Sequence, residues 1–350
     1  MPRTLSNWEY RQLLSEGQKL MGRRLEKVYE PNPGLFRFDF SFGDSLVVKL
    51  GKYFYLTQEP PAAPQNPSGF AMYLRKYLEG RKLEAFEGMG SDRIYRLSFR
   101  EAPVLLLEQF AGGNLFLLDG EERIMRAYHA KPSEKRQYKS GQKYEYPPSA
   151  SFSFPPGKKE WEAALQDKPS ASLSSLLGRW PIGKIYTQTL LEELGWEGKK
   201  ANELDGRQVD ELLGRLADRM AAVTPKVYEE KEAEGEVAEL ALVALARFEQ
   251  PPCTPKLFPS FSQAVEYFFS HVQTAGPQPE SPHFIRLRKR MEEQQAGLER
   301  LEKEIEAGSQ ETRWLEENLH TLEERREKIL GGETGKEKVD EKKRIWKVSD

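Results

Sequence analysis

The chain has 350 residues, which exceeds the usual size of one domain, so we expect two or three structural units. No run of about 18 apolar residues occurs and the N-terminus lacks an apolar core, so we expect neither a membrane span nor a secretory signal. Cys253 is the one cysteine and the four histidines show no ligand spacing, which excludes a disulfide and a zinc finger and leaves no metal or cofactor predicted. A cytoplasmic protein fits these features best.

The charge is distributed unevenly along the chain. Its formal net charge is −2, but residues 1–150 carry 23 Lys and Arg against 18 Asp and Glu, whereas the remainder carries 30 against 37. The first part therefore has a net charge of +5 and the second part −7. A polyanionic partner for the N-terminal part is compatible with this distribution.

The first 150 residues combine two helix patterns with many strand patterns. Residues 4–22 have helical spacing, and Ser6 with Glu9 forms a possible capping box at their start. Residues 35–42 (LFRFDFSF) alternate apolar and polar side chains, which predicts a strand with one buried face. A strand pair follows at 45–57, then a Pro-rich loop at 59–69, a helix at 70–80 that Gly80 ends, and four strand candidates between 81 and 120. Asp119-Gly120 predicts a hairpin into residues 123–130.

The middle of the chain changes from strands to helices and back. A segment rich in proline and serine at 144–157 marks a boundary, and residues 158–222 have helical patterns. Strand-like runs return at 225–230 and 235–248, followed by a helix at 259–271 whose buried face is expected to include Val265, Phe268 and Phe269. We expect this second group of strands to return to the first sheet, so the fold class is α+β.

Residues 284–329 show the strongest periodicity in the chain. Apolar side chains recur at alternating steps of three and four residues and occupy ten of fourteen seam positions, which predicts a long coiled-coil helix. No second heptad run is visible in the chain, so the partner helix would come from another copy, another protein or a separately encoded C-terminal half. The predicted units are 1–150, a β-rich domain; 158–222, a helical unit; 223–281, strands and a helix returning to the first domain; 284–330, the coiled-coil arm; and 331–350, a disordered tail.

Few motifs in the sequence indicate chemistry. There is no P-loop, no nucleophile elbow and no Cys/His pattern. Asp92-Arg93 stands at the start of a predicted strand, where an arginine oriented by a carboxylate can bind phosphate or a base edge; a surface ion pair is the simpler alternative. Residues 181–195 (PIGKIYTQTLLEELG) resemble a helix-hairpin-helix, in which Gly183 and Lys184 would bind phosphate; an ordinary helix pair is the alternative.

Basic clusters with interleaved aromatic residues also suit an RNA partner. One cluster surrounds Arg75 and Lys76, beside Tyr73 and Tyr77. Each cluster alone is equally compatible with a solvated face.

Five blocks of the sequence stand out together: MGRRLEKVYEPNPGLFRFDF, FYLT, NPSGFAMYLRKYLEGRKLEAFEGMGSDRIYRLSF, GGNLFLLD and FPSFSQAVEYFFS. In this order they resemble the N-terminal half of the NFACT family of ribosome-quality-control factors, whose bacterial members carry the older name of fibronectin-binding proteins. The resemblance implies a first domain like that of formamidopyrimidine-DNA glycosylases, with an inserted helix-hairpin-helix and then a coiled-coil arm. DNA glycosylase activity is not expected, because Arg3 follows Pro2 where the glycosylases have an acid, and the zinc finger is missing.

The resemblance also implies a function without covalent chemistry of its own. Members bind the large ribosomal subunit that holds a stalled peptidyl-tRNA, and recruit tRNA, chiefly alanyl-tRNA, for untemplated C-terminal tailing of the nascent chain. The family's tRNA-recruiting Asp-Arg pair matches Asp92 and Arg93, and an acidic position of its first helix aligns with Glu9, where Asp is usual. The alternatives are a fibronectin-binding surface adhesin and a reduced ribosome-binding coiled-coil protein without tailing activity.

Overall fold

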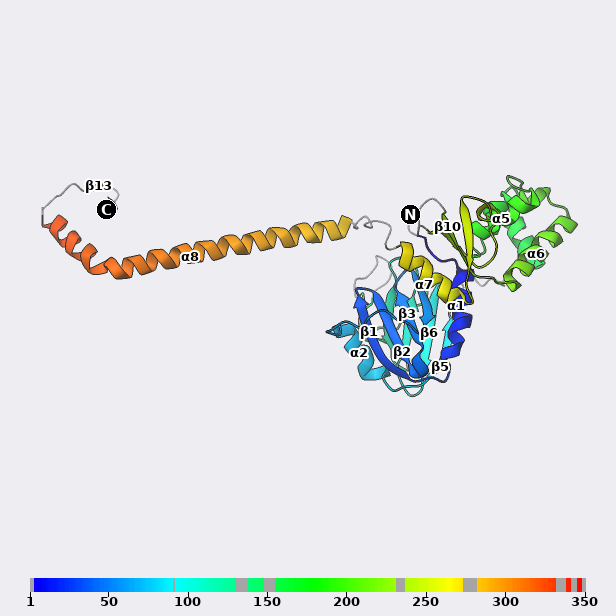
Figure 1. Cartoon of the computed structure of the whole chain (residues 1–350), viewed down its shortest axis with the longest axis horizontal. Coiled ribbons are helices and arrows are strands. Elements are labelled where there is room, and N and C mark those ends of the chain that lie inside the picture. The colour runs from blue at the N-terminus through cyan, green and yellow to red at the C-terminus, as the bar shows by residue number, and fades with distance from the viewer. Residues whose placement is uncertain are drawn as a thin grey trace. The chain divides into compact units, whose positions relative to one another are not determined.

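The computed structural model describes residues 3–90, 92–129, 138–147, 155–230, 237–272, 282–331, 338–340 and 345–347 (Figure 1). The chain divides into two compact units, Met1–Ala275 and Gly276–Asp350. Antiparallel sheets and helices both contribute to the first unit, which confirms the α+β class. Within the described residues, no helix has the length and apolar character needed to span a bilayer.

Two antiparallel meanders form the β-rich part of the first unit. The four-stranded sheet contains β1 (Leu25–Asn32), β2 (Leu35–Phe40), β3 (Ser45–Lys49) and β4 (Tyr53–Thr57), in chain order. The five-stranded sheet contains β5 (Leu83–Gly88), β6 (Ile94–Phe99), β7 (Val104–Glu108), β8 (Asn114–Leu118) and β9 (Ile124–Ala127), also in chain order. The predicted strands and the hairpin into β9 are confirmed, and β2 alternates buried and half-buried side chains as its sequence predicts.

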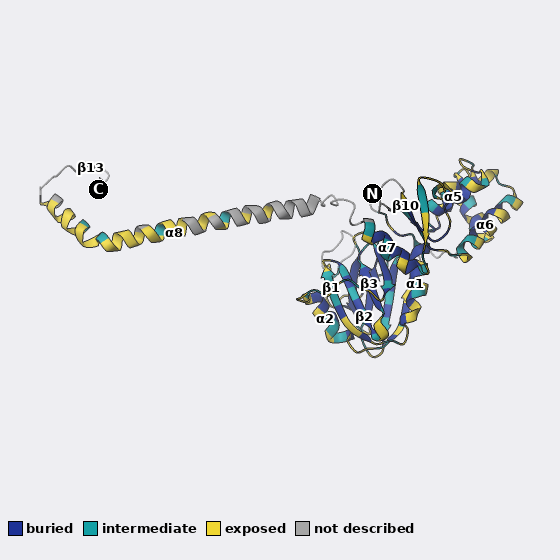
Figure 2. Cartoon of the chain, viewed as in Figure 1, coloured by how far each residue is buried: buried dark blue, intermediate teal, exposed yellow. Residues whose placement is uncertain are grey.

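The main core lies between these sheets and continues into the rest of the unit (Figure 2). Phe54 on β4 contacts Tyr95 on β6, with ring centroids 5.0 Å apart, which joins the two sheets. The five-stranded sheet buries side chains on both faces: Leu105 and Leu107 belong to the main core, whereas Leu106 belongs to a second, smaller core. A run of consecutive apolar residues such as β7 is typical of a strand that is covered on both sides.

Three helices pack against the meanders: α1 (Asn7–Gly17, extended by the 3-10 turn η1, Gln18–Leu20), α2 (Gly69–Leu78) and α7 (Phe261–Val272). α2 contacts β1, while α1 and α7 contact β4 and each other. The Glu16 carboxylate of α1 accepts the N–H groups of Phe261 and Ser262, which satisfies free donors at the start of α7. Phe268 and Phe269 are buried as predicted.

The helical segment contains α3 (Lys158–Asp167), α4 (Leu173–Leu177), α5 (Lys184–Leu194) and α6 (Gly206–Ala221), with a 3-10 turn η3 (Ala201–Glu203). Trp161 and Trp180 stack with centroids 6.2 Å apart, and both are buried. α4 and α5 form the predicted hairpin around Gly183. Its assignment as a helix-hairpin-helix stays a prediction, as does the likeness to glycosylases.

The second group of strands forms a sheet of its own. β10 (Lys226–Glu230) pairs with β11 (Val237–Ala241) on one side and with β12 (Cys253–Leu257) on the other, and a 3-10 turn η4 (Ala246–Phe248) lies between β11 and β12. The expectation that these strands return to the first sheet is therefore wrong. Contact with the first meander is made through α7, which packs against β4, β10 and β11.

The second unit is dominated by α8 (Pro282–Leu330), a helix of 49 residues. Its helical state agrees with the periodicity of the sequence, whereas its pairing in a coiled coil stays a prediction. Leu301, Ile305 and Leu315 on this helix are each at least half exposed. The tail predicted to be disordered contains two short paired strands, β13 (Lys338–Asp340) and β14 (Ile345–Lys347), and its other residues beyond Gly331 lie outside the described ones.

Candidate functional site

The first turn of α1 is fixed by the predicted capping box. Ser6 Oγ accepts the Glu9 N–H at 3.3 Å, and the Glu9 carboxylate accepts the Ser6 N–H at 2.7 Å. This reciprocal pair satisfies two donors at the start of the helix and sets the direction of the chain that precedes it.

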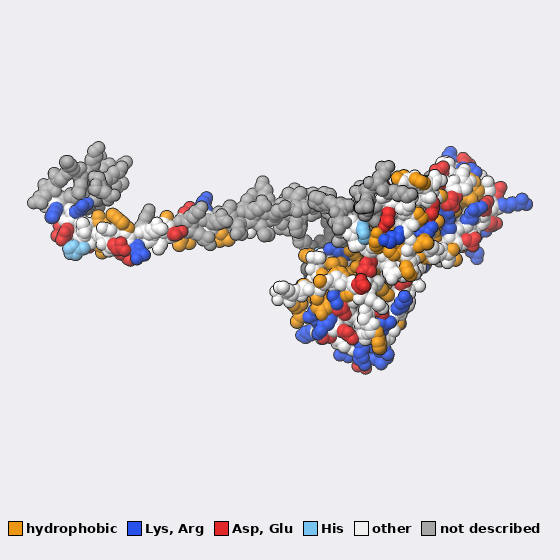
Figure 3. Space-filling view, in the orientation of Figure 1, with side chains coloured by type: hydrophobic (Ala, Val, Ile, Leu, Met, Phe, Trp, Pro, Cys, Tyr) orange, Lys and Arg blue, Asp and Glu red, His pale blue; other side chains and the backbone are white. Residues whose placement is uncertain are grey.

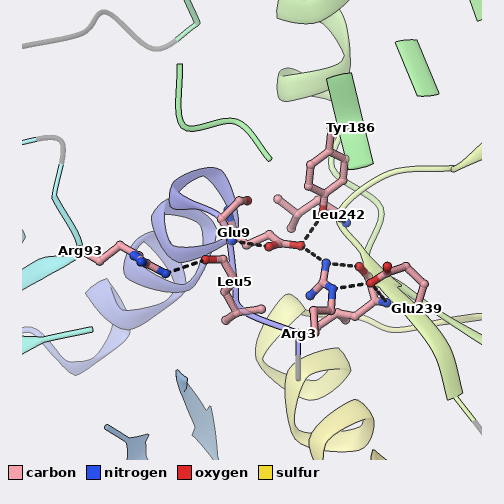
Figure 4. A network of polar contacts seen from close by, with 9 residues as sticks. Arg3, Leu5, Glu9, Arg93, Tyr186, Glu239 and Leu242 are labelled. Carbon is pink, nitrogen blue, oxygen red and sulfur yellow. Dashed lines mark hydrogen bonds and ion pairs between the residues drawn. The ribbon is translucent and has the colours of Figure 1, made fainter. Parts of the chain in front are cut away.

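The Glu9 carboxylate is also the centre of a buried polar network (Figure 4). It forms an ion pair with Arg3, and it accepts a hydrogen bond from the Tyr186 hydroxyl at 2.5 Å. Tyr186 accepts the Leu242 N–H at 3.1 Å, and Arg3 forms a second ion pair with Glu239. One network thus connects α1, α5 and β11.

Opposite charges lie in contact within this network, since Arg3 pairs with both Glu9 and Glu239. Burial alone would lower the pKa of Arg3, but the Glu9 and Glu239 carboxylates outweigh that effect and raise it. Burial and the neighbouring Glu9 raise the pKa of Tyr186, so its hydroxyl stays protonated at neutral pH. Glu9 itself is 1% exposed. We predicted a role for Glu9 in tRNA binding; its position allows that role only through the elements it holds together.

A cavity of about 520 Å³ opens beside this network. Gly183, at the start of α5, packs against Ser6 so closely that a Cβ atom at Gly183 would lie 2.9 Å from the Ser6 Cβ. The N-termini of α1 and α5 therefore lie side by side. The cavity is lined by Leu5, Ser6, Asn7, Arg93, Ser174, Leu177, Gly178, Trp180, Pro181, Gly183, Lys184 and Thr187.

Arg93 and Lys184 bring positive charge to this cavity. Arg93 precedes β6, and its guanidinium donates to the Leu5 carbonyl at 3.4 Å, which directs it to the start of α1. Asp92 lies next to it and is half-buried. At α5, Gly183 offers no side-chain cap to the N–H groups of the first turn. Two helix N-termini, a guanidinium and an ammonium form an arrangement suited to phosphate.

The structure brings three predicted site residues to this cavity, Arg93, Gly183 and Lys184. Arg75 and Lys76 lie elsewhere, on α2. The Arg75 guanidinium donates to the Val28 carbonyl at 2.7 Å and lies 4.7 Å from the centre of the Tyr29 ring. Those contacts attach α2 to β1. Neither Arg75 nor Lys76 lines the cavity.

Some lining residues escaped the sequence analysis. Asn7, Ser174 and Thr187 line the cavity, but no local pattern sets them apart. Ser6 had a signal through its capping box, although that signal indicated a helix start and not a binding site.

One protein-family model matches most of the chain. The model of the NFACT N-terminal and middle domains matches residues 11–334. The chain belongs to the NFACT family. Its curated relatives include ribosome quality control complex subunit 2 of Saccharomyces cerevisiae, 31% identical over 193 residues, and the archaeal Rqc2 homolog aRqcH of Methanocaldococcus jannaschii, 28% identical over 221 residues. The matches cover 52% and 57% of this chain but 18% and 32% of those proteins, so this NFACT chain spans less than a third of either relative.

Two solved structures share the fold. The fibrinogen binding protein from Staphylococcus aureus is 16% identical with a TM-score of 0.58, and the match covers 75% of this chain and 98% of that one. The N-terminal part of the fibronectin/fibrinogen-binding protein from Streptococcus suis is 21% identical with a TM-score of 0.59, covering 76% and 99%. At these identities the likeness concerns the fold alone.

Proposed function

We propose that this NFACT chain is an RNA-binding factor of ribosome quality control. Its membership of the family and its relatives named for ribosome quality control support this role. In the proposal, the chain binds a large ribosomal subunit that carries a stalled peptidyl-tRNA and works in the cytoplasm. The reaction centre belongs to the ribosome, so the chain needs no catalytic residue of its own.

We further propose that the cavity at the start of α1 and α5 contacts tRNA. The observation that supports this proposal is that Arg93, Lys184 and two helix N-termini all lie at one cavity. Arg93 would bind a phosphate or a base edge, Asp92 would orient it, and the backbone N–H groups at Lys184 would bind a second phosphate. Held in this way, tRNA, chiefly alanyl-tRNA, would support untemplated tailing of the nascent chain.

Affinity purification of tagged variants tests this assignment. Arg93→Ala should lower tRNA recovery about tenfold or more, since a charge-assisted hydrogen bond contributes roughly 1.5–3 kcal/mol, while recovery of the large subunit is retained. Arg215→Ala is the matched control, because Arg215 is an exposed arginine on α6 that pairs with Glu211 and does not line the cavity. Recovery of tRNA by Arg93→Ala at the level of the unmodified chain would contradict the proposal.

The alternatives make different predictions in the same experiment. A reduced ribosome-binding protein would recover the large subunit without tRNA, even before mutation. A fibronectin-binding adhesin would recover neither the large subunit nor tRNA. Surface labelling of intact cells, as a second measurement, would detect it. The name of the Streptococcus suis protein mentions fibronectin, but its likeness to this chain extends to the fold alone.

A further inference from the structure

Phe42 occupies an unusual position for an aromatic side chain. It lies in the turn between β2 and β3, and 87% of it is exposed. Its ring therefore gains little from the hydrophobic effect, which normally drives phenylalanine into a core.

The backbone at Phe42 is also unfavourable for phenylalanine. Phe42 has φ 70° and ψ 23°, and Gly43 follows with φ 82°. Two successive residues with positive φ are typical of a type I′ turn, whose first central position favours Asn, Asp or Gly. A Cβ-bearing residue in this region crowds the next carbonyl. Asparagine would suit the backbone of this turn better than phenylalanine does. The requirements of the fold therefore do not explain an aromatic ring at position 42.

An arginine lies against this ring. The Arg23 guanidinium lies 5.7 Å from the centre of the Phe42 ring, donates to the Ser41 carbonyl at 3.3 Å and forms an ion pair with Asp44. These contacts fix Arg23 beside the ring, while most of the ring remains open to solvent. A guanidinium on an aromatic ring builds a stacking platform.

Three hydrogen-bonded segments form what we call the basic turn surface, residues 21–25, 41–44 and 80–83. The Ser41 N–H donates to the Arg24 carbonyl, and the Leu25 N–H donates to the Arg81 carbonyl, both at 2.9 Å. The segments contain four basic residues against one acidic residue. Lys and Arg side chains gather at the lower edge of the first unit in Figure 3, where β2 ends in Figure 1.

We propose that the basic turn surface binds unpaired RNA, with one base stacked on Phe42 and the adjoining phosphates held by Arg24, Arg81 and Lys82. Aromatic rings flanked by arginine suit the faces of splayed bases, and the surrounding charge suits their backbone. A protein partner would require a wider apolar patch than the Phe42 ring and the partly exposed Met21 provide. This inference rests on the proposed function, because a factor that binds the large ribosomal subunit meets ribosomal RNA.

The basic turn surface is separate from the cavity at Arg93. That cavity opens at the first residues of α1, whereas Met21 follows η1 beyond the other end of this helix. Eleven residues at 1.5 Å each make α1 about 16 Å long. The two sites can therefore be mutated independently.

Fluorescence anisotropy with a labelled 12-nucleotide oligouridine tests the stacking. Phe42→Asn should weaken binding about fivefold or more, because stacking is lost, yet its melting temperature should equal or exceed that of the unmodified chain, because asparagine suits the turn. Phe42→Trp should retain binding. Leu257→Asn is the control, since Leu257 is 62% exposed on β12, outside the surface.

Photocrosslinking with a 5-iodouracil oligonucleotide adds a readout that a purely structural role would not move. Mass spectrometry should place the crosslink at Phe42. No oligouridine binding by the unmodified chain, equal binding by Phe42→Asn, or a crosslink confined to other residues would overturn the proposal. Loss of large-subunit recovery by Phe42→Asn with unchanged oligouridine binding would also overturn it, in favour of a protein partner. Failure of this proposal is read from oligouridine binding by Phe42→Asn, whereas failure of the tRNA assignment is read from tRNA recovery by Arg93→Ala, so the two failures are distinguishable.

Discussion

The Tyr186 hydroxyl joins residues that lie far apart in the sequence. It donates to Glu9 and accepts from the Leu242 N–H, and its ring makes an edge contact with Trp8 at 4.6 Å. The position of α5 relative to α1, and so the shape of the cavity at Arg93, depends on these contacts. Such a buried network is sensitive to the loss of any one member.

We predict that Tyr186→Phe lowers the free energy of unfolding by about 1–3 kcal/mol, because the Leu242 N–H loses its acceptor and the Glu9 carboxylate loses a donor. Urea denaturation followed by circular dichroism would measure this as a lower midpoint. Tyr29→Phe is the matched control, since it removes a hydroxyl from a half-buried tyrosine outside the network. Equal midpoints for both variants would show that the network does not stabilise the fold.

At the scale of elements, Gly183 determines how closely α5 approaches α1. Its φ is +116°, and an added Cβ would meet Ser6 at 2.9 Å and Tyr186 at 3.0 Å. Either feature alone disfavours another residue. Together they make glycine the residue that allows two helix N-termini to share one cavity.

Gly183→Ala should therefore destabilise the first unit and lower tRNA recovery, because α5 must move away from Ser6. Gly198→Ala separates steric contact from backbone strain, since Gly198 has φ +76° but no atom within 4 Å of its added Cβ. We expect about 1 kcal/mol of destabilisation for Gly198→Ala and a larger loss for Gly183→Ala. Thermal denaturation gives the ranking, and the reverse order would count against the close approach.

Patterns within single helices and strands predicted much of this fold. They did not predict the contacts between elements that lie far apart in the sequence. The alternation in β2 and the Ser6 capping box were visible because both are local. β12 was missed because Pro251, Pro252 and Pro255 are typical of a loop; Pro255 is tolerated because β12 is an edge strand. Arg93 and Gly183 are 90 residues apart, and no spacing rule predicts their shared cavity. Arg93 was singled out by the Asp92-Arg93 dipeptide and again by the family resemblance, and Gly183 was singled out by its turn.

At the scale of the whole molecule, the main core and both candidate sites lie in the first unit. The last buried residue of that core is Phe269, and the cavity at Arg93 and the basic turn surface use residues up to Thr187. The second unit contributes an amphipathic helix whose apolar side chains Leu298, Leu301, Ile305, Trp314, Leu315 and Leu319 are at least half exposed. Stability of the fold and pairing of α8 are therefore expected to be separable properties.

A chain ending at Ala275 tests this separation. Because the first unit contains its own core, we predict a cooperative thermal transition within about 2 °C of the full chain and unchanged oligouridine binding. Far-UV circular dichroism should lose the signal of the 49 residues of α8. The matched control carries Leu301→Asn and Leu315→Asn in the full chain, which removes apolar surface from α8 without shortening it. A broad transition or a fall of more than about 5 °C in the shortened chain would mean that α8 supports the first unit directly.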